Sequence, residues 1–273
     1  METFTTKLNK AVELNQSLLC IGLDPAPEVM PIQDVALFNK HIIEATSDLV
    51  CAYKPNLGFY EALGTSGLVA LEKTLEAIPS HIPIIGDAKR GDVHALYAKA
   101  AFEVWGFDAV TVNAYAGRDT IEPFISYTDR GVFVLCRTSN PGAREFQDLL
   151  ATPEFGGDTR PVYEWIALHT QSWNTKNNLG LVVGATYPDE LRRIRDLCPD
   201  LPILLPGIGA QQGALEKSVR FGVDGRGQNL IISASRSVIY ASRDPNLYAQ
   251  KARQEAESLR TRINNELEHS RMS

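Results

Sequence analysis

The sequence has few of the residues that mark several common protein classes. Four cysteines occur among 273 residues, and no two of them have the Cys-x-x-Cys spacing. The five histidines are scattered, without a His-x-His or His-x-x-x-His pattern. These absences argue against a disulfide framework and against a metal site. They favour reduced, buried cysteines in a cytoplasmic protein.

Charge and hydrophobicity argue against two further classes. The formal net charge is −6, so we expect no surface for nucleic acid. No apolar run reaches transmembrane length, and the first ten residues hold no apolar signal segment, so we expect no membrane partner. Hydrophobic residues make up 44% of the chain, which is enough for one large core.

Apolar runs rich in β-forming residues alternate with helical patterns along the chain. Most runs are continuously apolar, which is typical of parallel strands covered on both faces. Helical periodicity is clear over residues 35–45, 59–78 and 93–105, where apolar side chains recur at i, i+3, i+4 and i+7. The eight expected strands span residues 18–23, 50–54, 82–88, 109–113, 131–137, 179–185, 201–207 and 229–235.

This alternation predicts an α/β protein whose residues 1–273 form a single (β/α)8 TIM-barrel domain. A doubly wound open sheet is the alternative, but no Gly-x-Gly-x-x-Gly follows the first strand. The charged, helix-prone segment 247–267 predicts the last barrel helix, which runs into a solvated helical tail from about residue 251. The irregular stretch 138–160 predicts either a lid over the catalytic face or a surface insertion.

The most informative motif is Asp87-Ala88-Lys89-Arg90-Gly91-Asp92, at the end of the third expected strand. Asp87 and Lys89 are two residues apart on a strand, so they should point to the same side. Charges at the mouth of a buried strand are costly unless they pair with one another. A solvated surface loop is the alternative, but the apolar strand before the motif favours a paired cluster in a site.

Other strands also end in charged or polar residues, at the face where barrel enzymes place their sites. Asp24 ends the first strand, Lys54 ends the second, and Ser139 follows the fifth. No Cys-His or Ser-His arrangement occurs at these ends, which argues against covalent acyl chemistry. The strand ends therefore indicate a site built from aspartate and lysine.

A phosphate site is predicted after the last two strands. The turn Pro206-Gly207-Ile208-Gly209-Ala210-Gln211 follows the seventh strand, and Arg236 ends the eighth. Backbone N–H groups in such turns bind phosphate in many barrels, and an arginine can complete the site. The alternative is that Arg236 only caps the barrel through a surface salt bridge.

Taken together, these motifs resemble the orotidine 5′-phosphate decarboxylase family. The resemblance covers nearly the whole chain, keeps the family's order and spacing, and looks like the longer bacterial subgroup. The matching segments are Gly22-Leu23-Asp24-Pro25, Tyr53-Lys54-Pro55-Asn56, Asp87-Ala88-Lys89-Arg90-Gly91-Asp92, Thr138-Ser139-Asn140-Pro141-Gly142 and Pro206-Gly207-Ile208-Gly209-Ala210-Gln211.

The resemblance implies the decarboxylation of orotidine 5′-monophosphate to UMP and CO2, the last step of de novo pyrimidine synthesis. It implies that neither a metal nor an organic cofactor takes part. It assigns Lys54, Asp87, Lys89 and Asp92 to a catalytic tetrad in which Lys89 donates the proton. It also places Asp92 in the neighbouring subunit's site, which implies a homodimer.

The resemblance also implies roles in substrate binding. Asp24 and Lys54 would hold the ribose hydroxyls, Ser139 would bind the pyrimidine, and Arg236 would bind the phosphate. Gln211 would bridge from the phosphate loop, with its Gly207 and Gly209, toward the base.

One position departs from the family's pattern. Ser235 stands before Arg236 where the family has glycine, and Tyr240 lies slightly further on, so the resemblance assigns the phosphate to Arg236 and leaves Tyr240 unassigned.

Three other functions stay open. The first alternative is a related barrel that acts on sugar phosphates through a metal-stabilised enediolate. The others are a Schiff-base aldolase that uses Lys54 or Lys89 and a nucleotide-binding protein without turnover.

Overall fold

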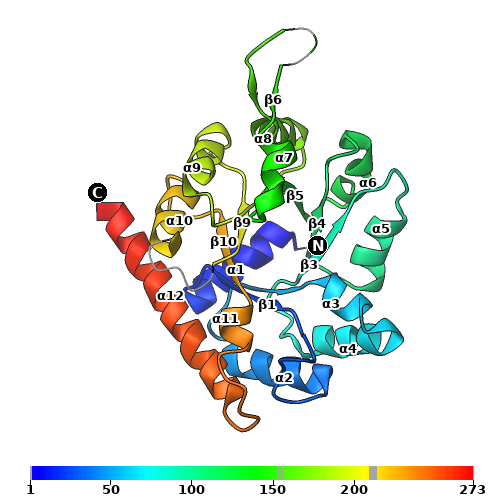
Figure 1. Ribbon diagram of the computed structural model, residues 1–273, viewed down its shortest axis with the longest axis vertical. Coiled ribbons are helices and arrows are strands. Elements are labelled where there is room, and N and C mark those ends of the chain that lie inside the picture. The colour runs from blue at the N-terminus through cyan, green and yellow to red at the C-terminus, as the bar shows by residue number, and fades with distance from the viewer. Residues whose placement is uncertain (1, 153, 155, 209–213, 273) are drawn as a thin grey trace.

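The computed structural model of the protein describes residues 2–152, 154, 156–208 and 214–272. Across these residues, eight parallel strands form one sheet in the order β2-β1-β10-β9-β8-β5-β4-β3. Parallel bridges from Tyr53 to Ile84 and from Asn56 to Asp87 join its two ends, so the sheet nearly closes into a barrel. Figure 1 looks down this barrel, with the helices around its outside. The predicted (β/α)8 fold is confirmed.

Each barrel strand overlaps the run predicted for it, and the boundaries differ by only a few residues. Two short strands outside the barrel, β6 (Leu150–Ala151) and β7 (Arg160–Pro161), pair as an antiparallel hairpin. The barrel strands are β1 (Leu19–Leu23), β2 (Ala52–Pro55), β3 (Ile85–Arg90), β4 (Ala109–Val112), β5 (Gly131–Arg137), β8 (Leu179–Val183), β9 (Ile203–Pro206) and β10 (Leu230–Ala234).

Helices of varied length connect the strands. Among the described residues, no helix combines the length and the apolar character needed to cross a membrane. The α-helices are α1 (Phe4–Asn15), α2 (Val35–Thr46), α3 (Leu57–Glu61), α4 (Gly64–Ala77), α5 (Leu96–Lys99), α6 (Glu122–Ile125), α7 (Arg144–Gln147), α8 (Val162–Trp173), α9 (Pro188–Leu197), α10 (Ala214–Gly222), α11 (Arg236–Ile239) and α12 (Tyr248–Met272). The π-helix is η1 (Ala100–Val104), and the 3-10 helices are η2 (Arg118–Thr120) and η3 (Pro141–Ala143).

The barrel interior is a packed layer of side chains, closed at one end by α1. Inward residues such as Cys20, Phe133 and Leu204 come from alternating strand positions and form one buried cluster. Phe4 and Leu8 of α1 belong to the same cluster, and the ring of Phe4 meets that of Phe133 edge to face at 5.7 Å between centroids. Helix α1 covers the amino ends of the strands, so a site in this barrel can form only at their carboxyl ends.

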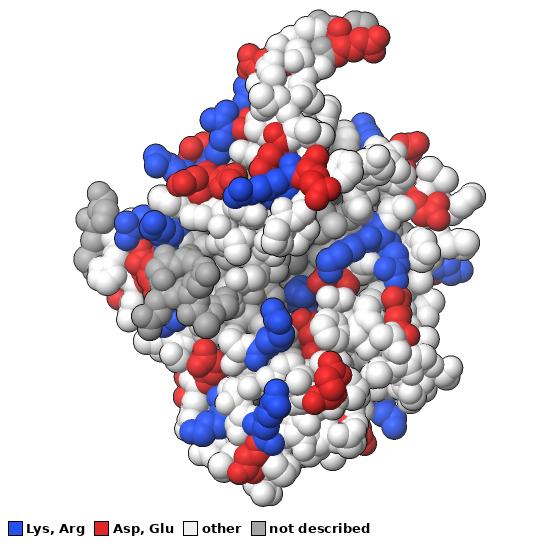
Figure 2. Space-filling view, viewed as in Figure 1, with Lys and Arg blue, Asp and Glu red and all other residues white. Residues whose placement is uncertain are grey.

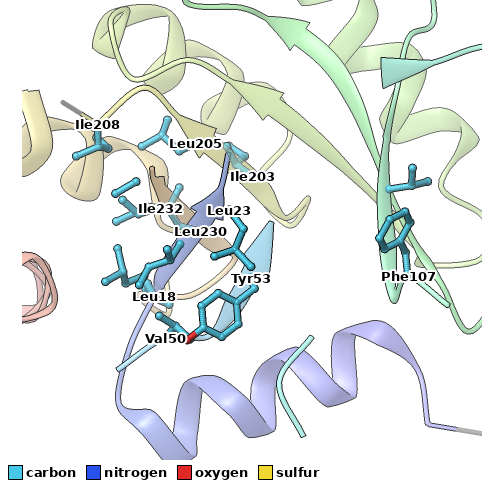
Figure 3. Packing of buried hydrophobic residues seen from close by; sticks show 14 of the residues in the cluster. Leu18, Leu23, Val50, Tyr53, Phe107, Ile203, Leu205, Ile208, Leu230 and Ile232 are labelled. Carbon is cyan, nitrogen blue, oxygen red and sulfur yellow. The ribbon is translucent and has the colours of Figure 1, made fainter. Parts of the chain in front are cut away.

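A second, larger buried cluster lies between the strands and the surrounding helices. On β1, Leu19, Ile21 and Leu23 contribute to it, while Cys20 between them points inward. Figure 3 shows part of this outer layer, in which Leu18, Val50 and Tyr53 lie close together. The continuously apolar runs in the sequence follow from this burial on both faces.

The predicted solvated tail from about residue 251 needs correction. Helix α12 continues unbroken to Met272 along the side of the barrel (Figure 1). Beyond residue 251, four apolar side chains of this helix are buried at helical spacing, so much of this segment is packed rather than solvated. These side chains are Ala252, Ala256, Leu259 and Ile263.

The apolar face predicted over residues 93–105 also differs from the structure. Here α5 passes into the π-helix η1, which changes the angular register of the side chains. Ala98 and Phe102 are buried, whereas several larger apolar residues point to solvent. The exposed ones are Val93, Leu96, Tyr97 and Val104, and we call them the 93–104 apolar face.

The stretch 138–160, predicted as irregular, contains local structure. It holds η3, α7 and strand β6, and Figure 1 shows the β6–β7 hairpin projecting outward from the barrel. Its first residues, Thr138 and Ser139, line the cavity described below, as does Gln147 at the end of α7. The hairpin thus extends away from the barrel while the start of the segment borders the candidate site.

Candidate active site

A cavity of about 610 Å³ lies at the carboxyl ends of the barrel strands, within the range of small-molecule sites. Figure 2 shows a hollow near the centre of this face, with acidic and basic side chains at its edge. Leu135, Val182 and Leu204, from the inner layer of the barrel, form its apolar part. The predicted site residues that line it are Asp24, Lys54, Asp87, Lys89, Ser139, Gly207 and Arg236.

Asp87 is the centre of a charged cluster in this cavity. Its Oδ2 accepts a hydrogen bond from Lys54 Nζ at 3.0 Å, and its Oδ1 accepts one from Lys89 Nζ at 2.7 Å. Thr111 Oγ1 also donates to Oδ1, at 2.9 Å. The predicted pairing of Asp87 with Lys89 is therefore present, and Lys54 joins it from the neighbouring strand.

Burial and charge act in opposite directions on this cluster. Burial alone would raise the pKa of Asp87, but the charges of Lys54 and Lys89 outweigh it and hold that pKa well below its usual range. Burial would lower the pKa of Lys54, but the charges of Asp87 and Asp24 outweigh it and raise that pKa. Both groups are therefore ionised at neutral pH. Lys54 is only 5% exposed, whereas the side chain of Lys89 is 47% exposed and reaches the open part of the cavity.

Asp24 lies at the end of β1 and is held by two residues that follow β10. Ser235 Oγ donates to Asp24 Oδ2 at 2.6 Å, and the Tyr240 hydroxyl donates to the Asp24 backbone carbonyl at 2.9 Å. Its other carboxylate oxygen, Oδ1, is buried and has no hydrogen-bond partner among the described residues. That oxygen can accept a hydrogen bond from a ligand hydroxyl.

Close backbone packing brings Ser139 beside Gly184, the residue that follows β8. A Cβ at Gly184 would lie 2.8 Å from the Ser139 nitrogen and from its Cβ, so only glycine allows this approach. Gly207 has φ +95°, and a Cβ added there would lie 3.6 Å from the Cβ and Oγ of Ser139. These two glycines let the loops after β5, β8 and β9 meet at the cavity wall.

The remaining predicted residues fall into three groups. Arg236 begins α11, is exposed, and makes no ion pair within the described part of the chain. Asp92 does not line the cavity, and its Oδ1 accepts a hydrogen bond from the His94 backbone N–H at 3.2 Å. The predicted phosphate-loop residues Gly209 and Gln211 lie outside the described residues.

A buried arginine beside the site, Arg137, was not predicted from the sequence. The fully buried Arg137 stacks on the ring of Tyr187 at 3.9 Å from its centroid and donates to Gln147 Oε1 at 3.2 Å. Gln147 Oε1 also accepts from the Thr138 backbone N–H at 2.8 Å. This network fixes the start of the loop that carries Ser139, and no spacing in the sequence signals it.

Thr111 was not predicted as a site residue either, although the sequence contains a signal for it. Ala109 belongs to the inner layer of the barrel, so Thr111, two residues further along β4, also points inward, nearer the carboxyl end. Its hydroxyl reaches Asp87, as described above. Period-2 counting from Ala109 would have placed this threonine in the site.

Within the described ranges, no group of three or more histidine, cysteine, aspartate or glutamate side chains is placed to hold a metal ion. Among the described residues, the cavity combines one buried ion pair, one accessible ammonium group and one arginine without an ion-pair partner. A nearly closed (β/α)8 barrel with such groups at the carboxyl ends of its strands has the architecture of the barrel enzymes.

Comparison with known proteins identifies the family. Residues 17–252 match the orotidine 5′-phosphate decarboxylase / HUMPS family, and the chain belongs to it. The chain is 49% identical over 271 residues to an orotidine 5′-phosphate decarboxylase from Thermomicrobium roseum, covering 96% of this chain and 95% of that protein. The predicted resemblance to this family is confirmed.

Solved structures agree with this assignment. The chain is similar to Leishmania donovani OMP decarboxylase, with a TM-score of 0.81 and 38% identity over 95% of this chain and 99% of that one. It is also similar to Leishmania donovani UMP synthase, with a TM-score of 0.83 and 39% identity over 95% of this chain. It spans 57% of the length of that synthase.

Proposed function

We propose that this protein decarboxylates orotidine 5′-monophosphate to UMP and CO2, the last step of pyrimidine nucleotide synthesis, without a metal or an organic cofactor. The observation that carries the proposal is the Lys54–Asp87–Lys89 cluster on the wall of the cavity, with its one accessible ammonium group. The activity named for the relatives supports the same reaction. The reaction would run in the cytoplasm, where the four free, buried cysteines fit reducing conditions.

Lys89 is the proton donor in this proposal. Breaking the bond between the pyrimidine ring and the carboxylate releases CO2 and leaves the bonding electron pair on the ring carbon. The Lys89 ammonium stabilises that charge and then transfers a proton to the same carbon, which gives UMP. Its exposure within the cavity supports this role, because Lys54 is buried against Asp87.

Asp87 fixes Lys89 and lies beside the leaving carboxylate. Two negative groups held close together raise the free energy of the bound substrate, and the loss of neutral CO2 removes the repulsion. Because Lys54 and Lys89 keep Asp87 ionised, the repulsion persists in the bound state. In the dimer proposed below, Asp92 of the other subunit supplies a second carboxylate.

The remaining roles concern binding. Asp24, through its unpartnered Oδ1, accepts a hydrogen bond from a ribose hydroxyl, and Lys54 contributes from the next strand. Ser139 binds the pyrimidine edge. Arg236 binds the phosphate together with the turn that begins at Gly207. The phosphate does not react, but its binding energy can hold the loops closed around the base.

The test is the decrease in ultraviolet absorbance as purified protein consumes orotidine 5′-monophosphate, measured with and without EDTA. We expect turnover that EDTA leaves unchanged, with UMP as the product. An EDTA-sensitive reaction would indicate instead a metal-dependent barrel of the related sugar-phosphate type. A substrate adduct trapped by borohydride would indicate an aldolase, and UMP binding without turnover would indicate a nucleotide-binding protein.

Arg236 provides a separate test of phosphate binding. Arg236→Ala should weaken transition-state binding by about 2–5 kcal/mol, because the phosphate keeps its charge and loses its partner. The kcat/KM for orotidine 5′-monophosphate should fall by the corresponding factor. For orotidine, which has no phosphate, kcat/KM should change little. The measurement is kcat/KM of wild type and variant on both substrates.

A matched control is Arg253→Ala. Arg253 pairs with Asp48 at the surface, at 2.7 Å, so its loss should cost under about 1 kcal/mol, and in stability rather than in catalysis. Equal losses on nucleotide and nucleoside in Arg236→Ala would show that this arginine does not act through the phosphate.

We further propose that the protein acts as a homodimer in which Asp92 completes the partner's site. Asp92 does not line the cavity of its own chain. It lies next to the 93–104 apolar face, whose exposure is unusual for large apolar side chains in a monomer. A second copy of this chain seated there would cover the face and bring Asp92 to the other cavity.

A further inference from the structure

The end of β3 departs from regular pairing at the charged cluster. Ile85 and Gly86 pair in register with Ala109 and Val110 of β4, and the next pair is Arg90 with Val112. Asp87, Ala88 and Lys89 therefore stand opposite one residue, Thr111. Such a bulge redirects side chains and leaves backbone groups without their ladder partners.

Lys89 occupies a strained position in this bulge. Its φ is +51°, in the left-handed region that side chains other than glycine rarely adopt. Its backbone N–H has no partner in the β4 ladder and donates instead to Thr111 Oγ1, at 3.0 Å. The side chain of Thr111 therefore helps to hold the backbone conformation that sets the direction of the Lys89 side chain.

The same hydroxyl also holds the carboxylate that pairs with Lys89. The Thr111 hydroxyl donates a hydrogen bond to Asp87 Oδ1 at 2.9 Å, and the same oxygen accepts a hydrogen bond from Lys89 Nζ. Thr111 is only 1% exposed, so solvent does not replace these bonds. A single buried hydroxyl thus ties the backbone of Lys89 to the side chain of Asp87.

We propose that Thr111 is a positioning residue that fixes the Lys89 ammonium for proton transfer, an inference that rests on the proposed decarboxylase function. Without the hydroxyl, the Lys89 N–H loses its partner and the strained backbone can relax. The ammonium then leaves the position at which it meets the ring carbon. Substrate binding, which Asp24, Ser139 and Arg236 provide, remains.

The experiment compares Thr111→Val, which keeps the shape and removes the hydroxyl, with Thr111→Ser, which keeps the hydroxyl. Thr111→Val should lower kcat about ten- to a hundredfold, the range for losing a hydrogen bond to a charged group. Its KM and the Kd of UMP should stay within about threefold, and Thr111→Ser should keep most of the kcat. Thr170→Val is the control, since Thr170 is buried in α8 and its hydroxyl donates to the Ile166 backbone carbonyl of the same helix.

Crystal structures of Thr111→Val and wild type provide a readout without substrate. Lys89 should leave the left-handed region, and its ammonium should move away from Asp87. An unchanged Lys89, equal kcat losses in the valine and serine variants, or a parallel loss of UMP affinity would each overturn the positioning role. Wild-type protein that leaves orotidine 5′-monophosphate intact would refute the proposed function, and the crystal structures would still decide the role of Thr111.

Discussion

Lys89→Ala should lower kcat for orotidine 5′-monophosphate by at least about a thousandfold, a barrier increase of roughly 4 kcal/mol. The variant loses both the charge that stabilises the ring carbanion and the proton that quenches it. Lys54 cannot substitute, because it is buried and its Nζ is bonded to Asp87 on the far side of that carboxylate. Steady-state kcat measured by ultraviolet absorbance gives the result directly.

The variant should still fold and bind product. The Lys89 side chain is 47% exposed, so its removal leaves no buried cavity, and Asp87 keeps its bonds to Lys54 and Thr111. We expect the Kd of UMP to change by less than about tenfold, or roughly 1.4 kcal/mol. Lys40→Ala is the matched control, a lysine of α2 paired only loosely with Glu44 at 3.8 Å. Retention of more than about a tenth of the wild-type kcat would contradict the assignment of Lys89.

The barrel itself could be predicted because its strands leave a simple signal. On β1, Leu19, Ile21 and Leu23 face the helices and Cys20 faces the barrel interior, so the run is apolar on both faces. A run of that kind is recognisable without knowledge of its partners. Its exact ends are not, because they depend on pairing with neighbouring strands, as in the bulge of β3.

Local environment was less predictable than local structure. Leu96 and Val104 fit a helical apolar pattern, yet both point to solvent, since the pattern does not say whether a face meets the chain's own core or another surface. In α12 the predicted helix is present, but its environment differs from the prediction in the opposite direction. Its many charges suggested solvent, but Ala252 and Ile263 are buried on one face of the same helix.

In the candidate site, residues at strand ends could be predicted and residues that act through contacts could not. Lys54 and Asp87 end neighbouring strands of a parallel barrel, so their meeting follows from the fold. Gln147 lines the cavity, and it is held there by Arg137, which stacks on the ring of Tyr187 and donates to the Gln147 side-chain oxygen. Such bonds depend on side-chain directions after folding, which residue spacing does not specify.

Mixing two inactive variants should restore activity if Asp92 serves the partner's site. Lys89→Ala and Asp92→Ala should each be nearly inactive alone. In a mixed dimer, one site carries both defects and the other has an intact Lys89 from one subunit and an intact Asp92 from the other. Random exchange of equal amounts makes about half of the dimers mixed, so about a quarter of all sites should become active.

The matched negative control combines Lys89→Ala with Asp87→Ala. Lys89 Nζ and Asp87 Oδ1 of one chain lie 2.7 Å apart, so both residues belong to the same site. Each site of a mixed dimer therefore keeps one defect. That mixture should stay inactive under conditions in which differently tagged subunits demonstrably exchange. Recovery in the first mixture alone requires Asp92 to act across the interface. No recovery in either would place Asp92 in its own chain's site, and the loop after β3 would then have to move to bring it there.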